Sequence, residues 1–286
     1  MLSESELALL RRVYAKQVTF AGGATSPALV DAFAAVRREK FVGPGPWPIF
    51  RWPGEGYRTT PDADPLYLYA DVLVGLIPER TLNNGQPSGH AAWLESVDIR
   101  PDDHVVHVGA GVGYYSAIMA ELAGPSGCVT AIEFDAELAT RAAANFHDRP
   151  NVTVIEGDGA RAAFAPADVI YVNAGATRPA DAWLDGLKDG GRLLLPLTTD
   201  RNFQAATAAQ GLVLLIERRG DDYLARFVSH IAVFPCEGMR DPASEQALSQ
   251  ALKTPRWGEV TRLYRGEPPA AERCWLQAPG WGLAYA

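Results

Sequence analysis

The chain has 286 residues, of which 48% are hydrophobic, and its 34 acidic and 26 basic residues give a formal net charge of −8. This size and apolar content argue against disorder, and an acidic chain without a Lys/Arg cluster disfavours nucleic acid as a partner. The acidic, amphipathic start is unlike a secretory signal, and no apolar run reaches membrane-spanning length. We therefore expect a cytoplasmic protein, with a monomer slightly favoured. The scattered cysteines are expected to be small buried side chains, not a disulfide framework: Cys128, Cys236 and Cys274.

The first 66 residues predict two helices and a long loop. Ser3 followed by Glu6 forms a capping-box pattern, and the apolar residues at 7, 10 and 13 share one helical face, so a helix is expected to about residue 16. Ser26-Pro27 predicts the start of a second helix over 27–41. The many Pro and Gly residues of 43–66 make regular structure improbable there, and a wrapping loop of this length usually has a functional reason.

From residue 104 onward, short β-branched runs alternate with helical segments. Strands are expected at 104–108, 128–133, 152–156, 168–172 and 192–197, with helices at 114–123, 135–146 and 179–187. This alternation is typical of a parallel sheet covered by helices on both faces. Two further β-rich runs, 211–219 and 223–234, flank Gly220-Asp221-Asp222 and predict an antiparallel hairpin.

The predicted fold class is α/β, with a doubly wound, mostly parallel, seven-stranded Rossmann-like sheet, a C-terminal antiparallel hairpin and extensions at both ends. The expected domains are residues 1–79 (helices and wrapping loop), 80–234 (core) and 235–286 (C-terminal extension packed on the core). The extension contains a helix candidate at 243–253, and its Trp275 and Trp281 are expected to be packing anchors.

The stretch "HVVHVGAGVGYYSAIMAELAG" (104–124) is a strand followed by three alternate glycines and a helix. Such a turn lets a ligand lie against the backbone, and the amides that open the helix can meet an anionic group. A phosphate-binding loop would need a Lys-Ser/Thr ending, which is missing. A dinucleotide site would need G-x-G-x-x-G, but here the third glycine comes one residue early and Tyr114 follows it.

Two acids narrow the choice of ligand. Glu133 ends the second strand, where a carboxylate accepts from ribose hydroxyls, and Asp158 follows the third strand between two glycines, where it can accept from an adenine amino group. Together with the glycine turn they favour S-adenosylmethionine (SAM). The bland alternatives are a turn-stabilising role for Asp158 and a solvated strand end for Glu133.

With these residues in place, residues 104–197 resemble the class I SAM-dependent methyltransferases, and within them the protein-L-isoaspartate O-methyltransferases, which act in protein repair. Over about residues 30–235, "RREKFV" (37–42) is similar to the family's Arg-x-x-Phe-Val segment and "YADVLVG" (69–75) to its Tyr-x-Asp. The run from "APADVIYVNAGAT" to "GGRLLLPL" is similar to its fourth strand, active-site loop and following strand.

The resemblance and the strand ends together give the expected cofactor-binding residues. They are His90, Gly109, Ala110, Gly111, Gly113, Tyr114, Glu133, Phe134, Gly157, Asp158, Gly159 and Asn173. His90 is included because the family's corresponding loop position often faces the cofactor. The alternative for His90 is a histidine at a helix N-terminus bonded to backbone.

The substrate loop departs from the family pattern. The family carries Thr-Ile-Ser-x-Pro, whose serine lies beside the transferred methyl group, whereas this loop reads "RTLNNGQPSGHAAW" (80–93). Depending on the alignment, Gly85 or Asn83 takes the place of the serine, and Ser88 lies on the far side of Pro87. The candidate catalytic residues are therefore Asn83, Gly85, Ser88 and, in the "NAGAT" loop (173–177), Asn173. The alternative for Asn173 is a turn-stabilising role.

The first hypothesis is a SAM-dependent carboxyl methyltransferase that acts on isoaspartyl, or aspartyl, residues of peptides and proteins. A carboxylate acceptor is already ionised at neutral pH, so no general base is required. The alternatives are a methyltransferase of the same fold with another acceptor, a non-catalytic SAM-binding module, and a nicotinamide oxidoreductase. No metal site is predicted, because the histidines at 104 and 107 fall on opposite faces of a strand.

Overall fold

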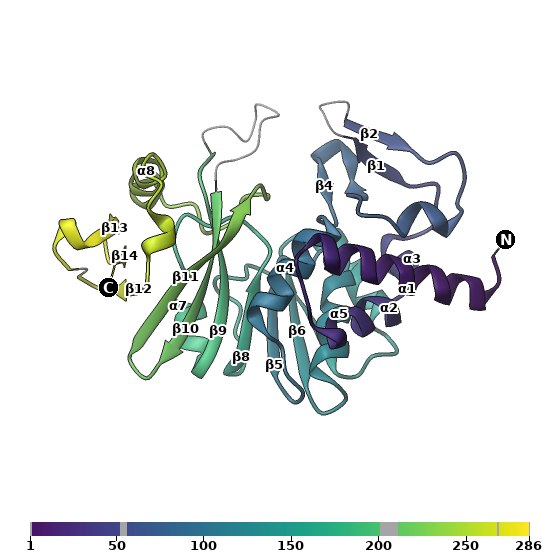
Figure 1. Cartoon of the computed structure of the whole chain (residues 1–286), viewed down its shortest axis with the longest axis horizontal. Helices are drawn as coiled ribbons and strands as arrows, with labels where there is room; N and C mark the ends of the chain where they lie inside the picture. The colour runs from purple at the N-terminus through teal and green to yellow at the C-terminus, as the bar shows by residue number, and fades with distance from the viewer. Residues whose placement is uncertain (1, 52–55, 201–210, 268, 286) are drawn as a thin grey trace. The chain divides into compact units, whose positions relative to one another are not determined.

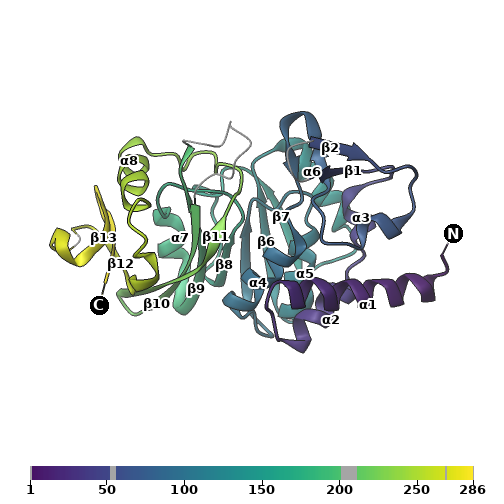
Figure 2. The ribbon, with the colours of Figure 1, turned by 45° about the horizontal axis from the view of Figure 1, so that its top comes forward.

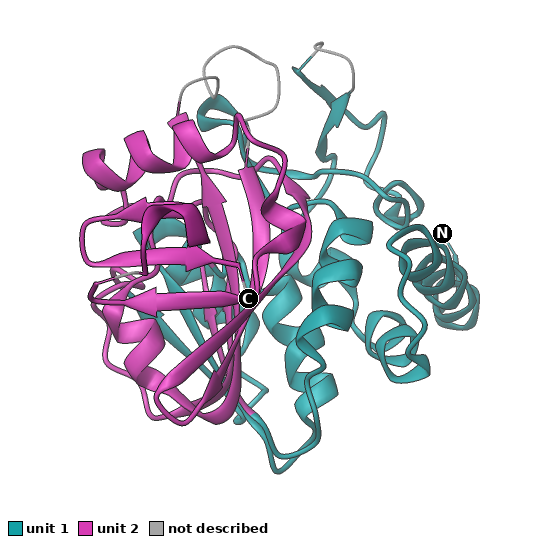
Figure 3. Cartoon of the chain, turned by 60° about the vertical axis from the view of Figure 1, so that its left-hand side comes forward, with its two compact units in different colours: residues 1–103, 110–156 teal, residues 104–109, 157–286 magenta. Residues whose placement is uncertain are grey.

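The computed structural model describes residues 2–51, 56–200, 211–267 and 269–285. The chain divides into two compact units, which Figure 3 colours separately. Unit 1 comprises residues 1–103 and 110–156, and unit 2 comprises residues 104–109 and 157–286. Within the described ranges, no helix combines the length and the apolar character that crossing a membrane requires.

Helix α1 (Glu4–Ala21) begins at the predicted capping box. The Ser3 backbone N–H donates to Glu6 Oε2 at 2.8 Å, and the Glu6 N–H donates to Ser3 Oγ at 3.3 Å. The helix runs past residue 16 to Ala21. The apolar face that contains residues 7, 10 and 13 is not the buried one at its last position: Val13 is 44% exposed, whereas Tyr14 and Val18 are buried. Packing of α1 on α2 and α4 therefore uses a face rotated away from Val13.

The single helix predicted for 27–41 is two helices, α2 (Pro27–Ala35) and α3 (Arg38–Val42). The predicted N-cap is confirmed, since the Leu29 N–H donates to Ser26 Oγ. Val36 has an extended backbone conformation (φ −86°, ψ 121°), which ends α2. The break lets Arg38 turn inward, where its fully buried guanidinium donates to the carbonyl oxygens of residues 68, 70 and 72 at 2.6, 3.0 and 2.7 Å.

The segment 43–66 contains strands β1 (Pro48–Arg51) and β2 (Gly56–Thr59), which pair antiparallel, so the expectation of irregular structure is wrong there. The Phe50 and Tyr57 rings face each other across this pair at 5.3 Å, an aromatic cross-strand contact that stabilises such ladders. Residues 52–55 of the expected loop lie outside the described residues. The next elements are η1 (Pro65–Leu68), β3 (Gly75–Ile77), η2 (Pro78–Arg80), β4 (Leu82–Asn83) and α4 (Pro87–Val97).

Unit 1 also holds the first part of the predicted alternation. It consists of α5 (Tyr114–Ala123), β6 (Cys128–Glu133), α6 (Ala136–Asn145) and β7 (Val152–Glu156). Strands β6 and β7 pair parallel, with Glu133 opposite Glu156 at their carboxyl ends. In Figure 2 the strands lie beside the helices that connect them. Cys128 is exposed at the start of β6, so the expectation that it is a buried side chain is wrong; Cys236 is buried.

Unit 2 contains one continuous run of strands in the order β13-β14-β12-β11-β10-β9-β8-β5. Strands β5 (His104–Val108), β8 (Ala167–Val172) and β9 (Leu187–Thr198) are parallel. Strands β10 (Gly211–Arg219) and β11 (Asp222–Ile231) form the predicted antiparallel hairpin, with Arg219 opposite Asp222. All seven predicted strands are present, and the predicted α/β fold class is confirmed.

The C-terminal extension adds strands that the sequence did not predict. Besides α7 (Asp181–Gly186), the predicted helix α8 (Pro242–Ala251) and the turns η4 (Trp257–Glu259) and η5 (Ala271–Arg273), unit 2 has β12 (Arg262–Arg265), β13 (Cys274–Ala278) and β14 (Trp281–Ala284). Figure 1 shows α8 beside these strands. Both tryptophans are buried anchors, as expected: Trp281 Nε1 donates to Ser244 Oγ and Trp275 Nε1 to the Thr254 carbonyl, each at 3.0 Å.

Candidate functional site

The glycine turn of unit 1 adopts backbone conformations that favour glycine. Gly111 and Gly113 have φ of 57° and 92°, and the Gly113 N–H donates to the Ala110 carbonyl at 2.9 Å, which closes a tight turn before α5. A Cβ at Gly113 would lie 2.3 Å from the ring of Phe146, whereas a Cβ at Gly111 would make only an ordinary contact with Leu76. The turn is therefore a backbone surface that requires glycine most strictly at 113.

Glu133 joins this turn directly. Its Oε2 accepts from the Gly111 N–H at 2.6 Å and its Oε1 from the Asp135 N–H at 2.9 Å. Only 8% of Glu133 is exposed, and burial raises the pKa of its carboxyl above the ordinary value. Each carboxylate oxygen has two lone pairs, so each retains an acceptor direction for a ligand hydroxyl. The solvated strand end considered for Glu133 is excluded by its burial.

The other predicted cofactor residues of unit 1 differ in exposure. Ala110 is buried, and its N–H donates to the Ile132 carbonyl at 3.2 Å. Tyr114 is buried with its hydroxyl 3.2 Å from that of Tyr14, and burial raises its pKa well above the ordinary value. Phe134, next to Glu133, is 56% exposed. The exposed Phe134 ring, directly after the buried Glu133, is available to pack on a flat ligand, whereas the Tyr114 ring packs in the core.

In unit 2, the first glycine packs against the "NAGAT" loop. Gly109 has φ of 75°, and a Cβ there would lie 3.1 Å from the Asn173 carbonyl oxygen. The Asn173 N–H donates to the Val108 carbonyl at 2.8 Å, and its side-chain amide lies 3.5 Å from the Gly109 carbonyl. The structure thus brings Gly109 and Asn173 together. The half-buried side-chain amide of Asn173 makes only a long, weak hydrogen bond to the Gly109 carbonyl.

Asp158 lies in a turn within unit 2. Its Oδ1 accepts from the Ala160 N–H at 2.9 Å, so the turn-stabilising role considered for it is present in the structure. Gly159 packs on Val108, where a Cβ would come within 2.3 Å, and Gly157 has φ of 157°. Gly238 of the C-terminal extension covers the same carboxylate, since a Cβ there would lie 2.5 Å from Asp158 Oδ2. A role of Asp158 toward adenine stays a prediction.

The substrate loop of unit 1 is built around a buried histidine. The His90 ring stacks on Tyr115 with centroids 3.4 Å apart and planes 11° from parallel. Gly85 has φ of 76°, and a Cβ there would lie 2.3 Å from His90 Nε2. The Gly85 carbonyl accepts from the Tyr115 hydroxyl at 3.2 Å. At Gly85, one of the two positions considered for the family serine, the histidine ring therefore occupies the space that a side chain would need.

The other two candidates in this loop hold its backbone. Asn83 Oδ1 accepts from the Gly85 N–H at 2.9 Å, and its amide nitrogen donates to the Tyr57 hydroxyl at 3.2 Å. Ser88 donates to Asp71 twice, from its N–H at 2.8 Å and from Oγ at 2.6 Å. Asn83 and Ser88 thus stabilise the loop conformation in this structure.

Sequence reasoning did not assign two residues that fix this loop. Asp71 accepts from Gln86 Nε2 at 2.9 Å as well as from Ser88. Asn84, which is buried, accepts at Oδ1 from the Val74 N–H at 2.9 Å and from Arg38 Nη2 at 3.3 Å. For Asp71, the Tyr-x-Asp pattern of the family resemblance was the one sequence feature that could have indicated its role in holding the loop.

The C-terminal extension is tied to the "NAGAT" loop within unit 2. The Thr177 N–H donates to the Met239 carbonyl at 3.0 Å, and Thr177 Oγ1 accepts from the Asp241 N–H at 2.8 Å. Arg240 Nη1 donates to the carbonyl oxygens of Gly175 and Thr198 at 3.0 and 3.1 Å. These contacts join the extension to the end of β8, although the sequence indicated no such connection.

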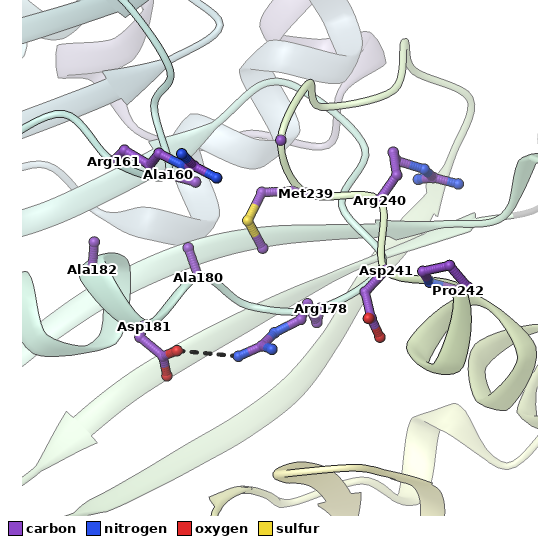
Figure 4. Close-up of a pocket in the computed structure, with 11 residues that line it drawn as sticks. Ala160, Arg161, Arg178, Ala180, Asp181, Ala182, Met239, Arg240, Asp241 and Pro242 are labelled. Carbon is purple, nitrogen blue, oxygen red and sulfur yellow. Dashed lines mark hydrogen bonds and ion pairs between the residues drawn. The ribbon is translucent and has the colours of Figure 1, made fainter.

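A cavity of about 390 Å³ lies beside this junction (Figure 4). Its arginines are paired with acids: Arg178 Nη2 lies 3.2 Å from Asp181, as Figure 4 shows, and Arg240 Nη2 lies 2.8 Å from Glu245. The cavity therefore presents mixed charges. It is lined by residues 160, 161, 178, 180–182 and 238–242.

The two strand histidines differ as their spacing predicts. His107 is buried, and burial lowers its pKa to about 3, whereas His104 is partly exposed and its Nδ1 lies 3.1 Å from the Pro166 carbonyl. In the part of the chain that the structure describes, no three His, Cys, Asp or Glu side chains cluster in a way that could hold a metal ion.

Together, the α/β fold, the glycine turn and the buried acid bonded to it define a protein of the class that binds a nucleoside-containing cofactor. The fold agrees with that of a solved protein-L-isoaspartate O-methyltransferase (TM-score 0.59, 20% identity, 88% of this chain and 74% of that one covered). It also agrees with a Plasmodium falciparum protein described as a PCMT and solved with S-adenosyl-L-homocysteine (TM-score 0.61, 17% identity, 79% and 98% covered).

The particular family follows from the sequence. The model of the family Protein-L-isoaspartate(D-aspartate) O-methyltransferase (PCMT) matches residues 60–222, more than half of the chain. The chain belongs to this family, as the sequence patterns predicted.

Named relatives agree. A protein-L-isoaspartate O-methyltransferase of Methanothermobacter thermautotrophicus is 33% identical over 59% of this chain and 76% of its own length. That of Rhodopseudomonas palustris is 32% identical over 66% and 84%. That of Ignicoccus hospitalis is 42% identical over 40% of this chain, and the match spans about half (56%) of that relative.

Proposed function

We propose that this protein is a SAM-dependent methyltransferase that transfers a methyl group to a carboxylate of a peptide or protein. Membership of the PCMT family supports the reaction class. The single observation that carries the cofactor assignment is the Glu133 carboxylate, buried and bonded to the Gly111 N–H at 2.6 Å. An acid held in this way keeps lone pairs for the two ribose hydroxyls, and the glycine turn leaves room for the adenosyl chain against the backbone.

When bound, SAM supplies a methyl group on a positively charged sulfur. The protein's own residues then have three tasks: holding the ribose, positioning the acceptor and excluding water. Glu133 serves the first. Because an acceptor carboxylate is ionised at neutral pH, no side chain has to remove a proton from it. A reaction that needs no general base agrees with a substrate loop in which the polar side chains of Asn83 and Ser88 form hydrogen bonds that hold the loop itself.

Asn173 is the residue we assign to acceptor positioning. Its backbone is fixed by the Val108 carbonyl, while its side-chain amide makes only a 3.5 Å contact, so the N–H groups can donate to a carboxylate. Asn173→Ala should raise KM for the acceptor more than it lowers SAM affinity, whereas Asn173→Gln, which keeps the amide, should recover part of the activity. An equal loss of SAM binding and acceptor binding would contradict this assignment.

A second candidate function is the same reaction type on another acceptor, a small metabolite or one particular modified peptide. The packing of Gly85 against His90 favours it, because the family serine cannot be accommodated at 85 while the ring stays in place. An isoaspartyl specificity, as the relatives' names describe it, would then require a different group to hold the acceptor.

The experiment is a methyl-transfer assay with labelled SAM, run in parallel against isoaspartyl peptides and a cell extract, with Glu133→Gln at limiting SAM as the control for weakened cofactor binding. Base-labile label on the peptides supports the first candidate, and label only in the extract supports the second. Unlabelled acceptors throughout, despite SAM binding by calorimetry, would leave a non-catalytic SAM-binding module. A melting-temperature rise with NAD instead of SAM would overturn the cofactor assignment. The cytoplasmic location stays a prediction.

A further inference from the structure

Helix α1 has two apolar faces on opposite sides. One face packs inside unit 1 and includes Tyr14, Ala15 and Val18, all buried. The other is exposed: Leu9, Val13 and Phe20 are 67%, 44% and 86% exposed, and Leu2, just before the helix, is 36% exposed. In Figure 3, α1 lies at the edge of unit 1 next to the N label. A helix surface with this many exposed large apolar side chains is a candidate interaction site.

The exposed residues follow a heptad pattern. At roughly 100° per residue, Leu9, Val13 and Phe20 fall within about 40° of one another on the helix circumference. Residues 6, 13 and 20 are spaced by seven, and so are residues 2, 9 and 16, and the two series are offset by three and four. This is the a/d spacing of a two-stranded coiled coil, with Val13 and Phe20 in one series and Leu2 and Leu9 in the other.

The pattern is complementary to itself in one orientation. In an antiparallel pair, a residue of one series faces a residue of the other series. If the two-fold axis passes the helix at residue 11, residue i faces residue 22 − i of the second copy. Leu9 then faces Val13 in two apolar layers of the paired helices, and Phe20 lies opposite Leu2, which precedes the helix of the other copy. The remaining positions of the stripe, Glu6 and Lys16, face each other.

The charges select this orientation. Both Glu6 and Lys16 are exposed in the chain. In the antiparallel pair the two contacts between them join opposite charges, whereas a parallel pair in register would place Glu6 against Glu6 and Lys16 against Lys16. Within its own chain, Glu6 accepts from the Ser3 N–H and Oγ through Oε2 in the capping box. A contact of this kind is isologous and closes as a dimer.

We infer that α1 forms a two-fold symmetric, antiparallel coiled coil with α1 of a second copy of this protein. In this arrangement residues 4–18 of the two copies overlap as helix over about 22 Å, which holds four layers, and Phe20 of each copy lies beyond them, opposite Leu2. An interface confined to one helix per copy is at the small end of the range for specific complexes, so we expect a weak dimer whose population depends on protein concentration. This inference concerns assembly, is independent of the proposed function, and departs from the monomer favoured by the sequence.

The test is sedimentation equilibrium of the full chain from about 1 to about 200 µM, a range that brackets a micromolar dissociation constant. The wild type should pass from monomer to dimer in this range. Leu9→Glu and Val13→Glu should each weaken the dimer at least tenfold, because they place charge in an apolar layer. Ala8→Glu, an exposed position of the same helix outside the stripe, is the matched control and should leave the dimer unchanged.

Charge reversal tests the orientation. Lys16→Glu should weaken the dimer and remove its stabilisation at low salt, because it places two acids face to face, whereas Lys16→Arg, which keeps the charge, should leave the dimer intact. Melting temperatures measured below 1 µM show whether each variant folds. A wild type that stays monomeric throughout the range, or a dimer that Leu9→Glu leaves intact, overturns the inference. A dimer insensitive to Lys16→Glu would overturn the antiparallel arrangement.

Discussion

The glycine turn at 111–113 and the substrate loop at 81–90 both lie in unit 1, but different kinds of interaction hold them. The turn is fixed by backbone groups and one buried carboxylate, Glu133. The loop is fixed by side chains that bond to its backbone, chiefly Asn83, Asn84 and Asp71. A backbone-built site tolerates little change in sequence, whereas a loop held by side chains can be rebuilt with other residues. Cofactor binding can therefore stay constant while acceptor handling changes.

The largest effect should come from adding a side chain to the turn. Gly113→Ala places a Cβ 2.3 Å from the Phe146 ring at φ 92°, so backbone strain and overpacking together should lower the free energy of unfolding by about 2–5 kcal/mol. Thermal unfolding and SAM calorimetry measure it. Gly111→Ala, with an ordinary Cβ contact, is the control and should cost about 1–2 kcal/mol. Equal costs at both positions would mean that the Phe146 contact is unimportant.

Restoring the family serine should be the next most disruptive change. Gly85→Ser must displace His90 from its stack on Tyr115 and should destabilise the protein by about 2–4 kcal/mol without gain of activity. Asn83→Ser loses only the bonds of the amide and should cost about 1 kcal/mol. Denaturant unfolding and the peptide assay distinguish them. If Gly85→Ser folds normally and gains isoaspartyl activity, then the loop is not rebuilt in the way we describe.

Glu133→Gln should change the affinity for SAM and the pH dependence of unfolding in ways that can be measured separately. Losing charge-assisted bonds to the ribose should weaken SAM binding about 10–100-fold. Burial raises the pKa of Glu133 above 4.5, so the wild type is stabilised by this group below pH 4.5 and loses that contribution as pH rises through the raised pKa. The glutamine amide nitrogen cannot accept, so the variant also loses one of the two backbone bonds. The melting temperature of the variant relative to that of the wild type should therefore rise from pH 4 to pH 7, and a difference that does not change with pH would contradict this.

The smallest effect should be Ser88→Ala. It removes one hydroxyl bond to Asp71 and leaves the bonds from the Ser88 N–H and from Gln86, so the expected loss is about 0.5–1.5 kcal/mol with SAM affinity unchanged. Asp71→Ala removes all three bonds and should cost more in the same unfolding measurement. Identical costs would show that the Ser88 hydroxyl alone accounts for the contribution of Asp71.

The strands and helix caps of the core could be predicted from the sequence, because each is indicated by a pattern of residues close together in the chain. Seven β-rich runs, the hairpin turn at 220–222 and the caps at Ser3 and Ser26 each depend on residues close in the chain. The break between α2 and α3 at Val36 could not be predicted from the sequence. It is accompanied by bonds from Arg38 to carbonyl groups some 30 residues away, and no local sequence pattern indicates such contacts. The strands of the tail are four or five residues long and gain their partners from distant segments, which periodicity does not register.

The candidate site divides in the same way. The glycines and Glu133 were found because a strand, a turn and an acid follow one another at fixed spacing. The contact of the His90 ring with Gly85 could not be predicted, because it depends on a stack with Tyr115 and on the φ of Gly85, and neither leaves a sequence pattern. The connection of Arg240 and Thr177 likewise joins segments about 60 residues apart.

The bonds from Thr177 and Arg240 have a practical consequence for anyone who shortens or swaps parts of this chain. Cutting after Phe234 would strip the Gly175, Thr177 and Thr198 carbonyl or hydroxyl groups of their bonding partners and uncover the Asp158 carboxylate. The 52 residues that follow Phe234 should therefore be kept together with the loop at 173–177, because a chimera that exchanges only one of the two would lose the hydrogen bonds between them.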